Sequence, residues 1–443
     1  MKAWNRLWWL LVTALLLAWP SVAQDAPLRL TLQEAIKRGL QANLGVLVAE
    51  TRSNEAAGAV QRSQSLLEPR VHIETPVAVQ NRSLAAIGLN VPQIPQVTNV
   101  FSTYDAHAYA DQPLVDLQAL HALRSARLSA SAVHSDYQDA RDLVVRSVAD
   151  IYLTAQSQFA DASAAASRVD TAQVLYRLAV AQRDSGVATG IDVLRAQVQL
   201  ANEQQSLVQA RNRAQGTVLS LARAIGISPG TAIELADPLE YHPAATVAVD
   251  SVLPQALSAR PDYQSLLRQR SALNEQLESS RARSLPKLLA SGNYGGIGRS
   301  PGSIRPTGAI QVEISMSVFD RDRQGEQAEL EARIRRLDRQ LDDARLGVEQ
   351  ELRQALLNLD SAAEEVRVAG VGLELAEKEL DLAQLRFGQG VTNNIEVTTA
   401  QDSLARAQQN RIVALTHHAD ARIAMVRALG NTEASYLEYL GSR

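Results

Sequence analysis

The chain contains no cysteine, few aromatic residues and no long apolar run in its body. Without cysteine it can form neither a disulfide nor a lipid-modified cysteine after a leader. Aromatic residues make up 4% of the 443 residues. Beyond the N-terminus no stretch reaches the length of about 18 apolar residues that a transmembrane helix needs. Any membrane crossing must therefore be made by β-strands.

The charge balance excludes one class of partner. The formal net charge is −4, from 44 Lys and Arg against 48 Asp and Glu. Proteins that bind nucleic acid present a basic face, which this balance does not provide. No nucleic-acid partner is expected.

The first 23 residues have the pattern of a secretory signal peptide. Lys2 and Arg6 precede an apolar run over 7–19, and small residues lead up to Ala23. Because the run is too short to cross a bilayer, we expect cleavage after Ala23 and export of the mature chain. The mature chain would carry 42 Lys and Arg against 48 Asp and Glu, a net charge of −6.

The remainder of the chain is a duplicated sequence. A shift of 204 residues aligns Asp116 with Asp320, Val144 with Val348, Leu153 with Leu357, Gly186 with Gly390 and Gly226 with Gly430. Earlier in each copy a shift of 217 aligns the helix breaks expected at Asn43 and Arg260–Pro261, so one copy has a longer loop near 81–100. A long period repeated only twice argues against a solenoid. It predicts two related halves, 24–226 and 251–430, joined by a connector at 227–250 and followed by a tail at 431–443.

Both halves contain a long heptad pattern. Apolar residues recur at steps of four and three from Leu330 to Phe387, with one stutter at Val348. The first half shows the same pattern from Ala126 to Ala179, interrupted only at the positions of Gln158 and Arg183. The pattern predicts coiled-coil helices over 114–184 and 320–387, each about 100 Å long. Helices of half that length are expected at 31–66, 191–225, 251–284 and 394–429. Each long helix should therefore pair with two short helices placed end to end.

Four segments alternate between apolar and polar residues, which predicts strands. The clearest is Ile310–Val318, and the others are 71–80, 104–111 and 287–297. Each has about ten residues, the length of a tilted strand that crosses hydrocarbon. Four strands cannot close a barrel, and every backbone group in lipid must be paired, so the chain must oligomerise. Three copies would give about twelve strands, an even number within the known range, although other closures stay open.

Ordered motifs in both halves resemble the TolC-type outer membrane efflux proteins. These motifs are Leu30–Ala35 with Asn43, the Phe319–Asp320 turn, Gly186 with Asp192–Leu194 and Ala196–Gln197, and Gly390 with Glu396–Val397 and Ala400–Gln401. The resemblance covers nearly the whole mature chain. It implies a mainly α fold with a small β part, in which a 12-stranded trimeric outer-membrane β-barrel continues as a periplasmic α-barrel of coiled-coil helices.

The same resemblance implies a function and a set of partners. The protein would be a homotrimeric exit duct in the outer-membrane lipid, part of a tripartite efflux or type I secretion system. It would passively conduct substrate delivered by an inner-membrane transporter and a periplasmic adaptor, or membrane fusion, protein, and would not be an enzyme. The alternative is a periplasmic coiled-coil scaffold without a pore, which has no reason to keep strands with one apolar face.

Two glycine-containing turns are expected between each long helix and the short helix that follows it. Gly186 and Gly390 allow a helical hairpin to reverse tightly. Glycines that simply end helices need no partner. The resemblance implies instead that an adaptor docks on these tips, through Gly186, Val187, Thr189, Gly390, Val391 and Asn394.

Asp192 and Glu396 occupy equivalent places just inside the two turns. Rings of carboxylates attract cations and can narrow a pore entrance, whereas acids near a helix start also favour the helix dipole. Both interpretations stay open. In some relatives a second acid, a tyrosine and an arginine help to hold the entrance shut. The corresponding places here hold Thr399, Phe387 and Thr392, so opening is expected to be easier or differently controlled.

No catalytic, cofactor-binding or metal-binding residue is expected. Asp320–Gly325 comes close to a calcium-loop spacing, but a strand precedes it, which favours a helix-capping role for Asp320. His417 and His418 are adjacent on a helix and point in different directions, which makes a poor metal pair. The glycines of 292–298 lack the strand-to-helix context of a phosphate loop and are expected in a strand and its loop.

Overall fold

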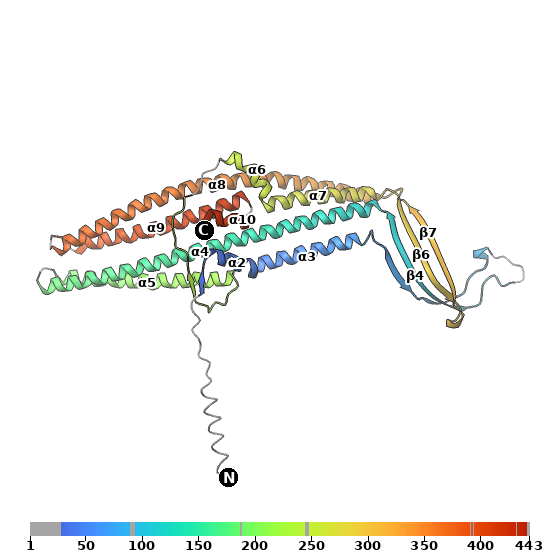
Figure 1. Ribbon diagram of the computed structural model, residues 1–443, viewed down its shortest axis with the longest axis horizontal. Coiled ribbons are helices and arrows are strands. Elements are labelled where there is room, and N and C mark those ends of the chain that lie inside the picture. The colour runs from blue at the N-terminus through green and yellow to red at the C-terminus, as the bar shows by residue number, and fades with distance from the viewer. Residues whose placement is uncertain are drawn as a thin grey trace, which may run out of the picture.

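The structure is a computed structural model that describes residues 28–88, 94–186, 188–243, 248–389, 391–392, 394–430 and 432–440. The molecule is elongated, with an antiparallel sheet at one end and two helical hairpin tips at the other (Figure 1). The signal peptide expected at 1–23 lies outside the described residues. None of the described helices combines the length and the apolar character needed to span a bilayer.

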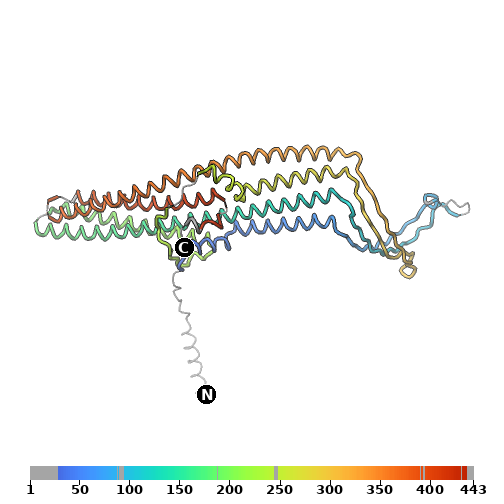
Figure 2. Tube along the Cα trace, turned by 45° about the horizontal axis from the view of Figure 1, so that its top comes forward, coloured from blue at the N-terminus to red at the C-terminus, as the bar shows by residue number. Residues whose placement is uncertain are grey.

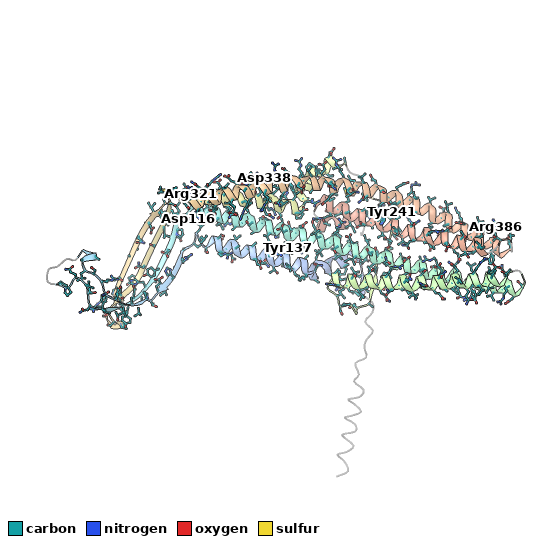
Figure 3. The ribbon with its side chains drawn as sticks, turned by 180° about the vertical axis from the view of Figure 1, so that it is seen from behind. Asp116, Tyr137, Tyr241, Arg321, Asp338 and Arg386 are labelled. Carbon is teal, nitrogen blue, oxygen red and sulfur yellow. The ribbon has the colours of Figure 1, made fainter. Side chains whose placement is uncertain are left out.

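Two long helices form the frame of the molecule. They are α4, Leu117–Asp184, and α8, Arg321–Gly388, each with 68 residues. The preceding aspartates, Asp116 and Asp320, accept hydrogen bonds from the third backbone N–H of each helix at 2.9 and 3.3 Å. They also pair with Lys287 and Arg283 at 3.3 and 2.8 Å. The capping role expected for Asp320 is confirmed, and Figure 3 shows both helix starts at the sheet end.

Short helices lie end to end along each long one. They are α2 Leu32–Ala42, α3 Leu44–Gln64, α5 Gly190–Ala224, α6 Val249–Ala259, α7 Pro261–Ala282 and α9 Asn394–Leu429. Figure 2 shows α3 and α5 following α4, and α7 and α9 following α8, which confirms the predicted pairing. The predicted breaks at Asn43 and Arg260–Pro261 fall between α2 and α3 and between α6 and α7.

A glycine packs against each of these breaks. Gly226 and Gly430 have φ of 70° and 84°, a conformation that residues with a side chain rarely adopt. A Cβ atom on Gly226 would lie 2.3 Å from the Cβ of Ala42, and one on Gly430 would lie 2.9 Å from the backbone nitrogen of Arg260. The two contacts are equivalent under the shifts found in the sequence. The duplication therefore extends to the packing at the middle of the molecule.

The sheet is antiparallel, in the order β2, β4, β6, β7, with β3 also paired to β4. Its strands are β2 Arg70–Glu74, β3 Val77–Gln80, β4 Phe101–Val115, β6 Lys287–Gly298 and β7 Arg305–Ser315. The expected placement of the 292–298 glycines in a strand is confirmed.

Three strand predictions need correction. The segment predicted at 71–80 is interrupted before Val77, at Pro76, whose nitrogen has no hydrogen to donate. The strand predicted at 104–111 is longer, because β6 supplies partners over most of β4. The strand predicted at Ile310–Val318 begins at Arg305 and ends at Ser315, opposite Lys287, where β6 begins. The alternating pattern continues beyond Ser315, but the partner strand does not.

The largest core cluster lies where the halves meet, around Tyr152 of α4. The buried Tyr152 hydroxyl donates to the backbone oxygen of Leu30 at 2.9 Å and lies 3.0 Å from a carboxylate oxygen of Asp237. Two elements here were not predicted: a parallel pair, β1 Leu28–Leu30 with β5 Ile233–Leu235, and α10, Thr432–Leu440, in the expected tail. Arg141 of α4 binds the carboxylate of Glu433, which holds α10 on the bundle.

Candidate functional site

The sheet has one apolar face. Ile73 of β2 and Ile310 of β7 are 75% and 91% exposed in the single chain, and Val312 and Ile314 are exposed beside Ile310. The strand registers bring these side chains to one side of the sheet, because residues two apart on a strand share a face. The alternation predicted from the sequence is confirmed, and this face suits contact with hydrocarbon.

The opposite face of the sheet is polar and internally connected. His107 of β4 binds the carboxylate of Asp105 and lies 2.7 Å from the hydroxyl of Thr307 on β7. The ring of His72 on β2 stacks on Tyr109, with centroids 5.2 Å apart and planes 13° apart. A β-sheet with one apolar and one polar face has the pattern of a barrel wall between lipid and an aqueous lumen.

Both outer edges of this sheet are unpaired in the described part of the chain. β2 and β3 pair only with β4, and β7 pairs only with β6. Backbone N–H and C=O groups in hydrocarbon require partners, so an isolated sheet of this kind is unstable in a membrane. Further strands must complete it.

At the other end of the molecule, Asp192 caps the first helix after the α4 turn. Its carboxylate accepts hydrogen bonds from the backbone N–H of Thr189 at 3.0 Å and from the Thr189 hydroxyl at 2.6 Å. These bonds, first that from the hydroxyl, lower the pKa of Asp192 below its ordinary value. Gly186 has φ of 78° with open space around it, which a tight reversal requires. Val187 lies outside the described residues.

The equivalent acid of the second tip is also held locally. Glu396 accepts a hydrogen bond from the Thr392 hydroxyl, and its carboxylate lies 3.4 Å from the guanidinium of Arg386. Figure 3 places Arg386 at the far end of the helices from the sheet. Asn394 begins α9, and Gly390 lies outside the described residues. Asp192 and Glu396 therefore occupy equivalent positions, as predicted, but their carboxylates have different partners.

The remaining residues predicted at the entrance divide into two kinds. Phe387 is buried in a cluster with Leu175 of α4 and Val397 of α9, so it fixes the helices rather than lining a surface. Its backbone oxygen accepts a hydrogen bond from Gln182 at 3.2 Å, which links the two tips. Thr399 is exposed and its hydroxyl donates to a backbone oxygen one turn earlier, at 2.9 Å.

Apolar side chains are exposed next to both turns. Ile191 and Ile395, which are equivalent in the two halves, are 55% and 50% exposed. Leu194 of α5 and Val391 before α9 are exposed as well. Apolar groups gathered on a surface tip indicate a contact with another protein more readily than contact with water. The docking residues predicted from the sequence included Val391 but not these isoleucines.

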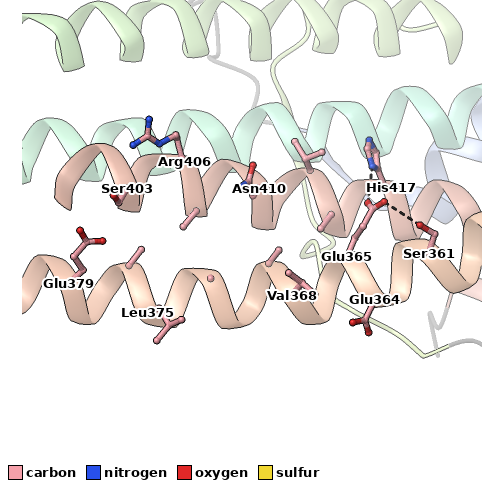
Figure 4. Close-up of a pocket in the computed structure, with 16 residues that line it drawn as sticks. Ser361, Glu364, Glu365, Val368, Leu375, Glu379, Ser403, Arg406, Asn410 and His417 are labelled. Atoms are coloured by element: carbon pink, nitrogen blue, oxygen red, sulfur yellow. Dashed lines mark hydrogen bonds and ion pairs between the residues drawn. The ribbon is translucent and has the colours of Figure 1, made fainter. Parts of the chain in front are cut away.

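A groove runs between α8 and α9 (Figure 4). Its volume is about 970 Å³, and Val368 and Leu375 form part of its apolar lining. Polar groups border it: Glu365 lies 3.3 Å from His417, and Arg406 lies further along α9. An open groove along a helix pair is a surface into which a further helix can pack.

No three or more His, Asp or Glu side chains in the described ranges lie together as metal ligands. The adjacent histidines diverge as predicted, since His417 pairs with Glu365 on the surface and His418 is buried.

An amphipathic sheet of membrane-crossing length that continues into long helical hairpins defines the class: a channel subunit of the bacterial outer membrane. The chain belongs to the outer membrane efflux protein family, whose family model matches residues 35–227 and 252–431. The two matched segments confirm the twofold internal repeat. The chain is thus an outer membrane efflux channel subunit, mainly α with a small β part.

Known relatives agree with this assignment. The chain is 23% identical over 397 residues to the pyoverdine export outer membrane protein OpmQ of Pseudomonas aeruginosa, covering 88% of this chain and 82% of the relative. Its fold matches the outer-membrane channel OprN with a TM-score of 0.76 at 20% identity, over 90% of this chain and 89% of that one. The outer membrane protein VceC of Vibrio cholerae gives 0.76 at 17% identity, over 90% and 96% of the two chains.

Proposed function

We propose that three copies of this chain form the exit duct of a tripartite efflux or type I secretion system. The duct conducts passively, and an inner-membrane transporter and a periplasmic adaptor protein deliver its substrate. The observation that carries the proposal is the sheet with one apolar face and two unpaired edges, which identical neighbours can complete. A scaffold without a pore would have no use for such a sheet. The chain itself performs no catalysis in this account.

The two faces of β7 provide the test in planar lipid bilayers. Val312 lies on the apolar face and Gln311 on the polar face of the same strand. Lysine on the lipid face near the middle of a bilayer costs about 2–4 kcal/mol, whereas substitutions on the lumen face alter selectivity. We expect discrete conductance steps from the wild type, loss of membrane insertion in Val312→Lys, and retained but altered conductance in Gln311→Lys.

The matched pair separates the channel from the scaffold. Both variants add one lysine to one strand, so a difference between them reports the face and not the charge. A wild-type protein that gives no current, or a Val312→Lys variant that inserts and conducts like Gln311→Lys, would contradict the channel proposal.

We also propose that the adaptor docks on the helical tips. The support is the exposed apolar side chains beside the turns, together with the reversal at Gly186. Val391→Asp should abolish binding of a purified periplasmic adaptor protein from the same organism while leaving bilayer conductance unchanged. Gln389→Asp is the control, because it adds the same charge at the same tip without removing an apolar contact. Equal binding by both variants would contradict docking through Val391.

Export of the chain is a further part of the proposal. Residues 1–23 would direct it through the inner membrane, and the mature protein would lie in the outer membrane with its helices in the periplasm. The mature N-terminus should therefore be Gln24, which N-terminal sequencing of protein extracted from the outer membrane can check. A protein that retains Met1 would contradict this part alone.

A further inference from the structure

One buried arginine of α9 has no counter-charge. Arg422 is 6% exposed, and its guanidinium makes no hydrogen bond or ion pair with any residue that the structure describes. Its Nε atom is enclosed by protein and unpartnered. The other buried arginines are paired, Arg260 with Asp262 at 2.6 Å and Arg427 with Asp139 at 2.5 Å. Arg422 is therefore the exception among them.

A histidine one turn earlier shares this environment. His418 is 2% exposed, and its Nε2 atom is also enclosed and unpartnered. Tyr241 of the connector lies against it, with ring centroids 4.7 Å apart, and Figure 3 shows Tyr241 near mid-length of the helical part. Burial, and then the positive charges of Arg422 and His242, lower the pKa of His418 to about 4. The charged groups that face His418 are thus cationic, and the Tyr241 phenol, which interacts electrostatically with Arg422, is the one titratable group of opposite sign that the structure places beside them.

The neighbouring carboxylates are engaged elsewhere. Asp420 of α9 faces Asp150 of α4, and Asp237 of the connector binds Tyr152 and the backbone N–H of Leu32. The connector residues 244–247, Ala-Ala-Thr-Val, supply no acid. A buried charge without a partner is strongly unfavourable, so a protein that retains one usually binds the opposite charge there.

We infer that Arg422 and His418 form an anion site between α9 and the connector, which binds a phosphate or carboxylate oxyanion. The planar guanidinium is suited to two parallel hydrogen bonds with such a group. The enclosed imidazole nitrogen provides a second contact when it carries a proton. The oxyanion comes either from solution, as inorganic phosphate, or from a carboxylate side chain of a neighbouring copy. The inference does not depend on conduction through the channel.

Thermal unfolding of the full-length assembly in detergent tests the site. Phosphate is titrated against chloride at constant ionic strength, and Arg422→Met is compared with wild type. Arg411→Met is the control, because Arg411 lies on the same helix and its guanidinium binds the backbone oxygen of Val366 at 2.9 Å. We expect phosphate to raise the thermal unfolding midpoint of the wild type and of the control, because a ligand that binds only the folded protein stabilises it. Arg422→Met should bind phosphate about tenfold more weakly or not at all.

Two further readouts make the result specific. If the anion comes from solution, Arg422→Met without phosphate should be at least as stable as wild type, because no unpaired buried charge remains. The pH readout uses sulfate, whose charge does not change between pH 8 and 6. Because a bound anion favours the protonated imidazole, sulfate affinity should rise as the pH falls from 8 to 6, and His418→Phe should weaken that rise.

The mass of the assembly distinguishes inorganic phosphate from a carboxylate of a neighbouring copy as the source of the anion. If a neighbouring copy supplies a carboxylate, phosphate has no effect on the assembled wild type, and Arg422→Met raises the fraction of single chains about tenfold or more. The proposal is overturned if phosphate has no effect and Arg422→Met stays assembled. It is also overturned if Arg411→Met loses the phosphate response as fully as Arg422→Met does.

Discussion

At the scale of single residues, Tyr152 connects the middle of α4 to the first strand and the connector. Its hydroxyl contacts Leu30 and Asp237, and its ring is completely buried. Tyr152→Phe should lower the free energy of unfolding by about 1–3 kcal/mol, because buried polar partners remain unsatisfied. Denaturant unfolding in detergent measures this. Tyr176→Phe, at a tyrosine of the same helix that packs in a small apolar cluster, should change stability much less; equal losses would contradict the explanation.

Asp150 should make stability depend on pH. Burial, and then the charge of Asp420, raise its pKa from 3.8 to about 6. The folded protein therefore binds this proton more tightly than the unfolded chain, and the contribution is complete below 3.8 and lost as the pH rises through about 6. Because the side chain is 40% exposed, we expect roughly 1 kcal/mol between pH 4 and 7.

Asp150→Asn should remove that dependence, and Asp420→Asn should reduce it by removing the repelling charge. Unfolding midpoints of the three proteins at pH 4, 5, 6 and 7 provide the comparison. A wild-type curve parallel to that of Asp150→Asn would contradict the assignment.

Two substitutions at the first tip separate the helix-capping role of Asp192 from a role in ion selection. Asparagine retains the cap but removes the charge, whereas Thr189→Ala removes a cap partner and retains the charge. If the carboxylates ring the entrance, Asp192→Asn and Glu396→Gln should each move the reversal potential of the channel in a salt gradient toward that of an unselective pore. Thr189→Ala should instead cost about 0.5–2 kcal/mol of stability with selectivity unchanged. An unchanged reversal potential in both charge variants would leave only the capping role.

At the scale of elements, the glycine contacts hold the two halves of each stacked helix pair together. Gly226→Ala should destabilise by roughly 2–4 kcal/mol, because it combines a left-handed backbone with a clash against Ala42. Gly216→Ala, in the open interior of α5, should be neutral or stabilise by up to about 1 kcal/mol. Thermal unfolding compares the two, and equal effects would contradict the packing argument.

The sequence predicted the elements unevenly, for physical reasons. Heptad spacing located α4 and α8 within a few residues, because a long helix repeats its contacts at every turn. Strand ends were less accurate, since a partner strand and not local alternation ends β7 at Ser315. Helix α10 was missed because a distant ion pair, Arg141 with Glu433, holds it in place.

In the candidate site, too, local sequence patterns predicted some features and tertiary contacts decided the others. Turn glycines and the acids after them are visible in the sequence because both copies repeat them. The burial of Phe387 and the unpaired Arg422 depend on which helix faces which, so no local pattern reveals them. The domain boundaries, the entrance constriction and the docking residues stay predictions.

At the scale of the whole molecule, the sheet and the helices impose the same requirement. The edges of β2, β3 and β7 need strand partners, and the groove between α8 and α9 can receive a neighbouring helix. Identical copies arranged around one axis satisfy both, because each copy offers one edge and one groove surface to the next. A closed ring of this kind leaves no strand edge in lipid.

The mass of the complex in detergent or lipid nanodiscs shows whether identical copies complete the sheet. Native mass spectrometry of the outer-membrane protein should give one dominant species of three chains. A sample that consists only of single chains, under conditions in which the protein remains folded, would contradict the account.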